Sequence, residues 1–306
     1  MKKFFIYTAI ALCLATLTAC NDFLTVEQKG KNTIPGFLSD PRGLHSGLVG
    51  AYQKYFSQYD RQFLKYPEVA GITANLNVTS GSDMLDQYNF VPNAVSATTS
   101  YYIWYSLGTA LANANNIIQY APIVAKDFPE RADFCEQQRG QALFLRALCH
   151  FDLVRVFAQP YNYTADASHL GIPVLTITPG PNDNPSRNTV KEVYDQILID
   201  LKEAATILTD EKATDSHYAS LQAVNAMQAR VYLYMEDWQN AYDYAVKAIA
   251  GQDLADKATL INMYANLTTQ GEAIFRLSGE AMSGQQKAFY NTQCVPSDQL
   301  LNMFDA

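Results

Sequence analysis

Few residues in this 306-residue chain have the types and spacing that catalysis or metal binding needs. The histidines are scattered along the sequence, at His45, His150, His169 and His217. None lies four residues from another, as a zinc-binding helix requires, and the chain has neither a nucleophile elbow nor a phosphate-binding glycine loop. Asp83 and Asp86 come closest to a pair of loop carboxylates, which a glycosidase would hold ~5–9 Å apart. We therefore expect no catalytic residue, no cofactor and no metal site, with a surface hydrolase as a remaining alternative.

The residues best suited to binding are aromatic and polar side chains between positions 52 and 105. Twelve of these 54 residues are aromatic, which is well above the 12% that aromatic residues make up in the whole chain. A flat ring can remove the apolar face of a sugar from water, while carboxylates and amides bond to its hydroxyls. The candidate ligand-binding residues are Asp86, Tyr88, Asn89, Tyr101 and Tyr102, and weaker candidates are Tyr161, Tyr163 and Tyr290. For Tyr88 and Tyr101, a place in the hydrophobic core is an equally good interpretation.

The first twenty residues predict export and lipidation. Lys2 and Lys3 precede an uncharged run from Phe4 to Leu17, which is too short to cross a bilayer. The sequence Leu17-Thr18-Ala19-Cys20 then resembles a bacterial lipobox, in which Cys20 is lipidated and becomes the N-terminus. We expect residues 1–19 to be a lipoprotein signal peptide and residues 20–38 a lipidated tether. An ordinary signal peptide with a chance cysteine is the alternative.

The charge of the chain argues against nucleic acid as a partner. The formal net charge is −8, and loss of Lys2 and Lys3 with the signal peptide would make it −10. Such a surface repels phosphate backbones.

The remaining cysteines are expected to be buried free thiols. Cys135 and Cys149 lie fourteen residues apart on one predicted helix, so ~21 Å separates them, far beyond disulfide reach. Cys294 could form a disulfide with either of them, and the sequence does not decide this.

Helical periodicity dominates the rest of the chain. The predicted long helices cover residues 41–58, 98–120, 131–157, 189–208, 221–235 and 238–250, and a short one follows Ser297. Asp40, Thr189 and Asp237 are the predicted N-caps, and Pro122 is expected to end the second helix. Short strands are expected at Pro173–Ile177 and Glu272–Leu277, and residues 59–97 read as one long irregular excursion.

The third predicted helix should be central, because it is apolar around much of its circumference between Ala142 and Phe157. His150 on this helix is expected to be a core histidine rather than a ligand. Tyr52, Phe56 and Trp104 fall on helical stripes and are also expected in the core.

Small and large residues alternate across the fifth and sixth predicted helices. They are Ala226, Ala229, Tyr234, Trp238, Ala241, Tyr244, Ala245 and Ala248. This spacing resembles a tetratricopeptide unit, with Trp238 packed between the two helices. The expected fold is therefore all-α dominated, a tetratricopeptide-like superhelix of helical hairpins with long irregular loops and minor short strands.

Several motifs, in order along the chain, resemble the SusD/RagB family of Bacteroidetes lipoproteins. They are Asp22-Phe23-Leu24 after the lipobox, Ala114-Asn115-Asn116-Ile117-Ile118, Leu145-Arg146-Ala147 through Phe157, Gly171-Ile172-Pro173-Val174, Arg187-Asn188-Thr189-Val190, Asp200-Leu201, Ala226 to Ile249, and Ile274-Phe275.

The resemblance implies a lipoprotein at the outer membrane, facing the cell exterior, that captures a glycan or other nutrient. It also implies a partner, a SusC-like TonB-dependent transporter to which the nutrient is delivered. Family members continue beyond residue 306, so residues 39–306 are expected to form a SusD-like helical domain that is incomplete at its C-terminus. A tetratricopeptide scaffold that binds a protein or peptide partner is the alternative function, and it predicts a concave groove lined by helix residues.

Overall fold

The computed structural model describes residues 33–59, 63–77, 84–91, 99–210, 216–266, 271–277 and 287–304. The chain divides into two compact units, Met1–Phe37 and Leu38–Ala306. The described part of the first unit is the short helix α3 (Ile34–Phe37) with the residue before it. The predicted signal peptide and Cys20 lie outside the described residues.

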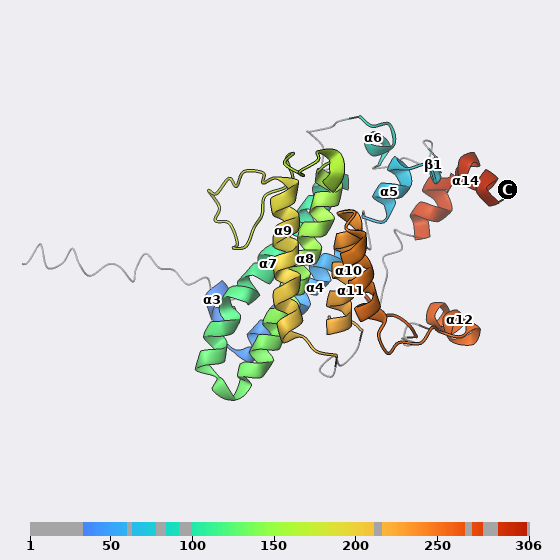
Figure 1. Cartoon of the computed structure of the whole chain (residues 1–306). Helices are drawn as coiled ribbons and strands as arrows, with labels where there is room; N and C mark the ends of the chain where they lie inside the picture. The colour runs from blue at the N-terminus through green and yellow to red at the C-terminus, as the bar shows by residue number, and fades with distance from the viewer. Residues whose placement is uncertain are drawn as a thin grey trace, which may run out of the picture. The chain divides into compact units, whose positions relative to one another are not determined.

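The second unit is built mainly from helices, which confirms the predicted fold class (Figure 1). Its long helices are α4 (Pro41–Tyr59), α7 (Thr99–Asp127), α8 (Ala132–Phe157), α9 (Val190–Ile207), α10 (Leu221–Tyr234) and α11 (Trp238–Ile249). Each packs on the next in chain order, and α4 also contacts α8. Neighbours in sequence are therefore neighbours in space, as in an array of helical hairpins.

The predicted N-caps are confirmed, and they set where the helices begin. Asp40 accepts a hydrogen bond from the amide of Gly43, and Asp237 accepts one from Asn240. Thr189 and Glu192 form a reciprocal capping box at the start of α9. Each cap satisfies amide groups that the first helical turn leaves without a partner.

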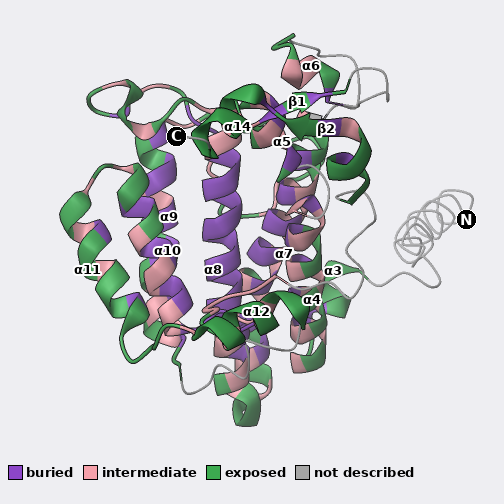
Figure 2. Cartoon of the chain, turned by 90° about the vertical axis from the view of Figure 1, so that its right-hand side faces the viewer, coloured by how far each residue is buried: buried purple, intermediate pink, exposed green. Residues whose placement is uncertain are grey.

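Helix α8 is the centre of the unit. All of its residues from Gly140 to Val154 are buried, and Figure 2 shows this helix in purple along most of its length. Gly140 faces Ile207 and Leu208, and a Cβ there would lie 2.9 Å from the side chains of both. The absence of a side chain at Gly140 thus lets the end of α9 approach the central helix.

The excursion between α4 and α7 is more ordered than predicted. It contains α5 (Lys65–Ala70), strand β1 (Ala74–Leu76) and α6 (Leu85–Tyr88). Strand β1 pairs antiparallel with β2 (Cys294–Pro296), which follows the π-helix η4 (Phe289–Gln293). A second hydrophobic cluster joins these elements, formed by Val69, Ala74, Leu76, Met84, Phe289 and Cys294. The pairing partner lies some 220 residues away in the sequence, so local patterns do not reveal it.

The remaining described elements are short: η2 (Pro129–Arg131), η3 (Tyr161–Tyr163), α12 (Lys257–Ala265) and α14 (Asp298–Phe304). Ser297 caps α14 by accepting from the amide of Leu300, as predicted.

Two predicted strands are wrong. The stretch Pro173–Ile177 is irregular, because its backbone bonds to helix side chains instead of a neighbouring strand. The stretch Glu272–Leu277 is also irregular where the structure describes it, and its Arg276 amide donates to the carbonyl of Ser216. Both segments are apolar enough to look like strands, but they lie on the helices as covering segments.

Two further expectations are corrected. Pro122 lies inside α7, which continues to Asp127, because buried Ala121 and Val124 on either side hold the last turns on the core. Trp238 is 63% exposed, so it does not pack between α10 and α11. The small residues Ala241 and Ala248 form the buried face of α11 instead.

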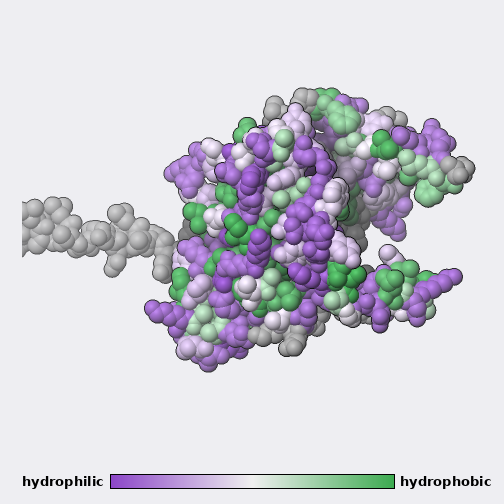
Figure 3. Space-filling model, in the orientation of Figure 1, coloured by the Kyte–Doolittle hydropathy of each residue, from purple (hydrophilic) through white to green (hydrophobic). Residues whose placement is uncertain are grey.

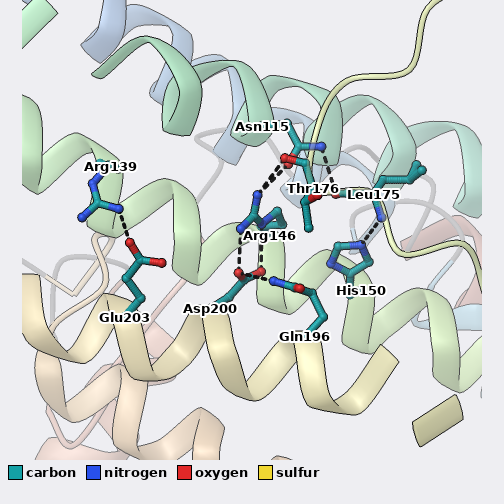
Figure 4. A network of polar contacts seen from close by, with 9 residues as sticks. All are labelled: Asn115, Arg139, Arg146, His150, Leu175, Thr176, Gln196, Asp200 and Glu203. Atoms are coloured by element: carbon teal, nitrogen blue, oxygen red, sulfur yellow. Dashed lines mark hydrogen bonds and ion pairs between the residues drawn. The ribbon is translucent and has the colours of Figure 1, made fainter. Parts of the chain in front are cut away.

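A buried ion pair connects α8 to α9 (Figure 4). Arg146 donates to both carboxylate oxygens of Asp200, at 2.8 and 2.7 Å. Its remaining nitrogen donates to the side chain of Asn115 on α7 and to the carbonyl of Thr176. Burial raises the pKa of Asp200 above its ordinary value, although the guanidinium of Arg146 opposes this shift. The network fixes three helices and one covering segment against each other.

His150 is a core histidine, as predicted. It is fully buried, and its Nε2 accepts a hydrogen bond from the amide of Leu175 at 3.2 Å. Burial, helped by the positive charge of Arg146, lowers the pKa of His150 to about 3. The neutral ring is therefore part of the folded state.

Replacing Arg146 with Leu should lower the free energy of unfolding by ~3–5 kcal/mol, because it leaves the buried carboxylate of Asp200 without its cation. Arg139→Leu is the matched control on the same helix: Arg139 pairs with Glu203, also on α9, but the two side chains are 19% and 44% exposed. We expect the control to cost about 1 kcal/mol or less. Urea denaturation measures both, and equal losses would show that the buried pair has no special role.

Replacing His150 with Gln should make stability less dependent on pH. Below pH 6.5 the unfolded histidine takes up a proton, whereas the folded one does so only near pH 3, so acid favours unfolding. Between pH 7.5 and pH 5 the wild type should lose about 2 kcal/mol more stability than the variant. Urea denaturation across this range tests the difference, and parallel pH curves would refute it.

Candidate functional site

An exposed group of aromatic rings lies at the start of α7. Tyr101 and Tyr102 are 52% and 41% exposed, and Tyr105, one helical turn later, is 53% exposed. The ring planes of Tyr101 and Tyr105 lie 14° apart with centroids 6.1 Å apart. Tyr102 meets Tyr101 edge-on at 5.6 Å. We call Tyr101, Tyr102, Trp104 and Tyr105 the aromatic face.

Trp104 belongs to this face, contrary to its predicted place in the core. It is 42% exposed, and its ring contacts the edge of Phe157, at the end of α8, with centroids 5.1 Å apart. The core side of this part of α7 is formed by Ile103 and Leu107, which are fully buried. Ile103 and Leu107 are spaced one helical turn apart in the sequence, and this spacing is the signal that could have placed Trp104 and Tyr105 away from the core.

The other predicted ligand-binding residues lie on or beside α6. Tyr88 is half-buried against the second hydrophobic cluster, Asp86 is half-buried, and Asn89 is exposed. The side chain of Gln87 donates to the hydroxyl of Ser100 at 3.5 Å, which brings α6 beside the start of α7. The two groups of candidates therefore lie near each other.

Phe90 is a further candidate that sequence reasoning did not select. Its side chain is 76% exposed, and its backbone adopts a φ of 54°, a conformation that costs energy for a residue with a side chain. Such backbone geometry is concentrated at ligand-binding sites. Phe90 thus offers an apolar ring on the loop after α6.

The weaker candidates are dispersed. Tyr161 packs edge-on against Tyr194, Tyr163 is 64% exposed beside His169, and Tyr290 lies on η4. None of these three rings contacts a ring of the aromatic face.

A cavity of about 440 Å³ lies between α4, α8, α10 and the segment 271–277. Its walls are mostly apolar, and its charged groups are Arg230 and Glu272. The guanidinium of Arg230 makes no hydrogen bond or ion pair within the described residues, whereas Glu272 accepts from the amide of Ala255. This cavity is of a size that holds small ligands.

The tyrosines of this cavity are already engaged. The hydroxyls of Tyr55 and Tyr59 each donate to the buried carboxylate of Asp152 at 2.8 Å, and Arg155 pairs with the same carboxylate. Burial raises the pKa of both hydroxyls above the usual range. They therefore provide ring surface to the cavity and fix α4 to α8.

The candidate residues offer aromatic surface and hydrogen-bonding groups. No group of three or more His, Cys, Asp or Glu side chains within the described residues is arranged to hold a metal ion. Cys135, Cys149 and Cys294 are free and buried, and burial raises the pKa of each thiol, which makes them poor nucleophiles. Asp83, half of the predicted carboxylate pair, lies outside the described residues.

Exposed apolar side chains are not confined to the aromatic face. Trp238 and Tyr242 on α11 are 63% and 67% exposed. On α12, at the lower right of Figure 3, hydrophobic residues also reach the surface, among them Leu260 and Ile261. No helix within the described part of the chain is both long and apolar enough to cross a membrane.

Comparison with known proteins finds one family. A SusD-like family model, described as "Starch-binding associating with outer membrane", matches residues 22–233. The SusD-like protein P38 of Formosa agariphila is 25% identical over 263 residues, which are 83% of this chain and 48% of that protein. The chain thus spans about half the length of this curated relative.

Solved structures with the same fold include a SusD superfamily protein of Bacteroides thetaiotaomicron, with a TM-score of 0.74 and 23% identity. That match covers 87% of this chain and 62% of the other. A laminarin-binding SusD-like protein matches with a TM-score of 0.56 and 19% identity, over 72% of this chain and 45% of the other.

Proposed function

Because the chain belongs to the SusD-like family, we propose that it is a surface lipoprotein that binds a glycan and delivers it to an outer-membrane transporter. The transporter would be a SusC-like TonB-dependent barrel. The protein would be anchored in the outer membrane through Cys20 and would face the cell exterior. In this proposal residues 1–19 are the signal peptide, residues 20–38 the tether, and residues 39–306 the helical domain.

The observation that carries the proposal is the aromatic face on α7. A group of aromatic rings exposed to water is unfavourable, so protein surfaces rarely contain one. Where such a group occurs, it marks a binding surface. A near-parallel pair such as Tyr101 and Tyr105 suits the flat apolar faces of sugar rings. The hydrogen bond from Gln87 to Ser100 brings α6 beside the start of α7, and in this proposal Asp86 on α6 and Asn89 directly after it bond to sugar hydroxyls.

The binding partners of relatives support a glycan ligand. The family description names starch, and one solved relative is named for laminarin, a polysaccharide. Because the chain covers only part of these relatives, the role of Tyr88, Tyr101 and Tyr102 in this protein is part of the proposal and not carried over from them. We propose a binding role rather than an enzymatic one.

A peptide-binding scaffold is the second candidate, and the cavity between α4, α8 and α10 favours it. That cavity is lined largely by helix residues, as the scaffold hypothesis predicts, and Arg230 is available to pair with an acidic group. Parallel screens against a glycan array and a peptide panel separate the two functions. Binding of peptides with failure of every glycan would favour the scaffold.

Replacing Tyr101 or Tyr105 with Ala should weaken binding of the glycan selected on the array by ~10-fold each. A ring gains on the order of 1–2 kcal/mol of binding free energy when it removes some tens of Å² of apolar surface from water, and the loss of this gain weakens affinity to the same extent. Thermal stability should not change, because both rings are about half exposed. Calorimetric titration and a thermal melt measure the two effects.

Tyr242→Ala is the matched control for these variants, because Tyr242 is also an exposed helix tyrosine, 67% exposed on α11. It should leave glycan affinity unchanged. If the control weakens binding as much as the α7 variants do, the binding surface has been assigned to the wrong helix.

Replacing Cys20 with Ala should release the protein from outer-membrane fractions, because the lipid chains on this residue would be its anchor. Fractionation and mass spectrometry of the N-terminal peptide check this. A variant that stays in the membrane, together with no acyl mass on the wild type, contradicts the lipoprotein proposal.

A further inference from the structure

A second cavity lies at the start of α4, beside the turn between α7 and α8. Its volume is about 510 Å³, within the range of small-ligand sites. The residues that line it are Asp40, Pro41, Arg42, His45, Ser46, Phe128, Arg131 and Phe134. None of them belongs to the aromatic face or to the cavity that includes Arg230.

The cavity is locally positive in an acidic protein. Arg42 and Arg131 both line it, and neither forms an ion pair with any described residue. The guanidinium of Arg131 lies over the ring of Phe134, 4.6 Å from its centroid. Among the described residues of the lining, Asp40 is the one carboxylate, against two cations, whereas the whole chain has a net charge of −8. The cavity therefore attracts an anion that the rest of the surface repels.

The lining also contains groups that suit an uncharged polar ring. Asp40 accepts one hydrogen bond, from Gly43, through Oδ1, and its other oxygen can accept another. His45 is held by a 3.1 Å hydrogen bond between its Nδ1 and the side chain of Gln138, which leaves Nε2 on the opposite side of the ring. Ser46 adds a hydroxyl, and Phe128 adds an aromatic surface.

We propose that this cavity binds the carboxylate of a uronic acid residue in an acidic glycan. A guanidinium matches a carboxylate in planar, two-point geometry, and two of them outweigh the repulsion from Asp40. Asp40 can in addition accept hydrogen bonds from the hydroxyls of a sugar, which favours a carboxylate carried on a sugar ring. The choice of a sugar rests on the proposed glycan-binding function, and the positive cavity is an observation independent of the aromatic face.

The test compares two disaccharides that differ only in carrying COO⁻ or CH₂OH at C5. Calorimetric titration of the full chain should show at least ~10-fold preference for the diuronate, as one desolvated charge-assisted contact allows. Arg42→Gln and Arg131→Gln should each remove most of this preference. Lys54→Gln, an exposed cation three turns further along α4, makes the same change in charge and should keep it.

The following outcomes overturn the proposal. Equal binding of the two disaccharides, or an unchanged preference in both arginine variants, removes the uronate site. Displacement of the diuronate by equimolar inorganic phosphate, or capture of the protein by phosphatidic acid vesicles that depends on Arg42 and Arg131, would assign the cavity to a phosphate group instead.

The aromatic-face variants separate this proposal from the proposed function. Tyr101→Ala and Tyr105→Ala should keep the preference for the diuronate while they weaken binding of the glycan selected on the array. Loss of that glycan binding alone concerns the aromatic face, and loss of the charge preference alone concerns this cavity.

Discussion

The ion pair between Arg146 and Asp200 is the interaction on which the arrangement of the helices depends. It lies in the interior, where either charge alone would be strongly destabilising, so the two side chains must meet with both hydrogen bonds formed. Asn115 and the carbonyl of Thr176 take up the remaining donors of the guanidinium. An apolar contact tolerates small shifts between helices, but this network does not, and it therefore sets the relative positions of α7, α8 and α9.

The same central helix sets the position of the candidate site. Less than two turns after Arg146, Asp152 accepts hydrogen bonds from Tyr55, Gln58 and Tyr59 and thereby fixes α4. At the end of α8, Phe157 supports the ring of Trp104. The aromatic face therefore lies on a helix that is held along its length, and its rings lose little freedom when a ligand binds.

Local signals in the sequence predicted what is local in the structure. Asp40, Thr189 and Asp237 each cap a helix because the bonds they make span only three residues. The wrong strands have distant partners: Leu175 is held by His150 and Asn115, and Arg276 by Ser216, which no local pattern reveals. Trp104 and Trp238 were misplaced because a large ring next to a buried stripe was taken as part of it, although the spacing of Ile103 and Leu107 marks the core side of α7. The motif residues Arg146, Asp152 and Asp200 indicated the family, but their physical role in the core became clear only with the structure.

Exposure alone does not make an aromatic residue a sugar-binding residue, and the contrast between α7 and α11 explains why. Trp238 and Tyr242 are more exposed than the rings on α7, yet neither contacts another ring among the residues that the structure describes. An isolated exposed ring must be ordered when a ligand binds, and that lost freedom offsets part of the gain. Tyr101 and Tyr105 already lie nearly parallel, so a ligand meets a surface that is arranged before binding. The geometry between rings, rather than their number or their exposure, is what distinguishes the face on α7.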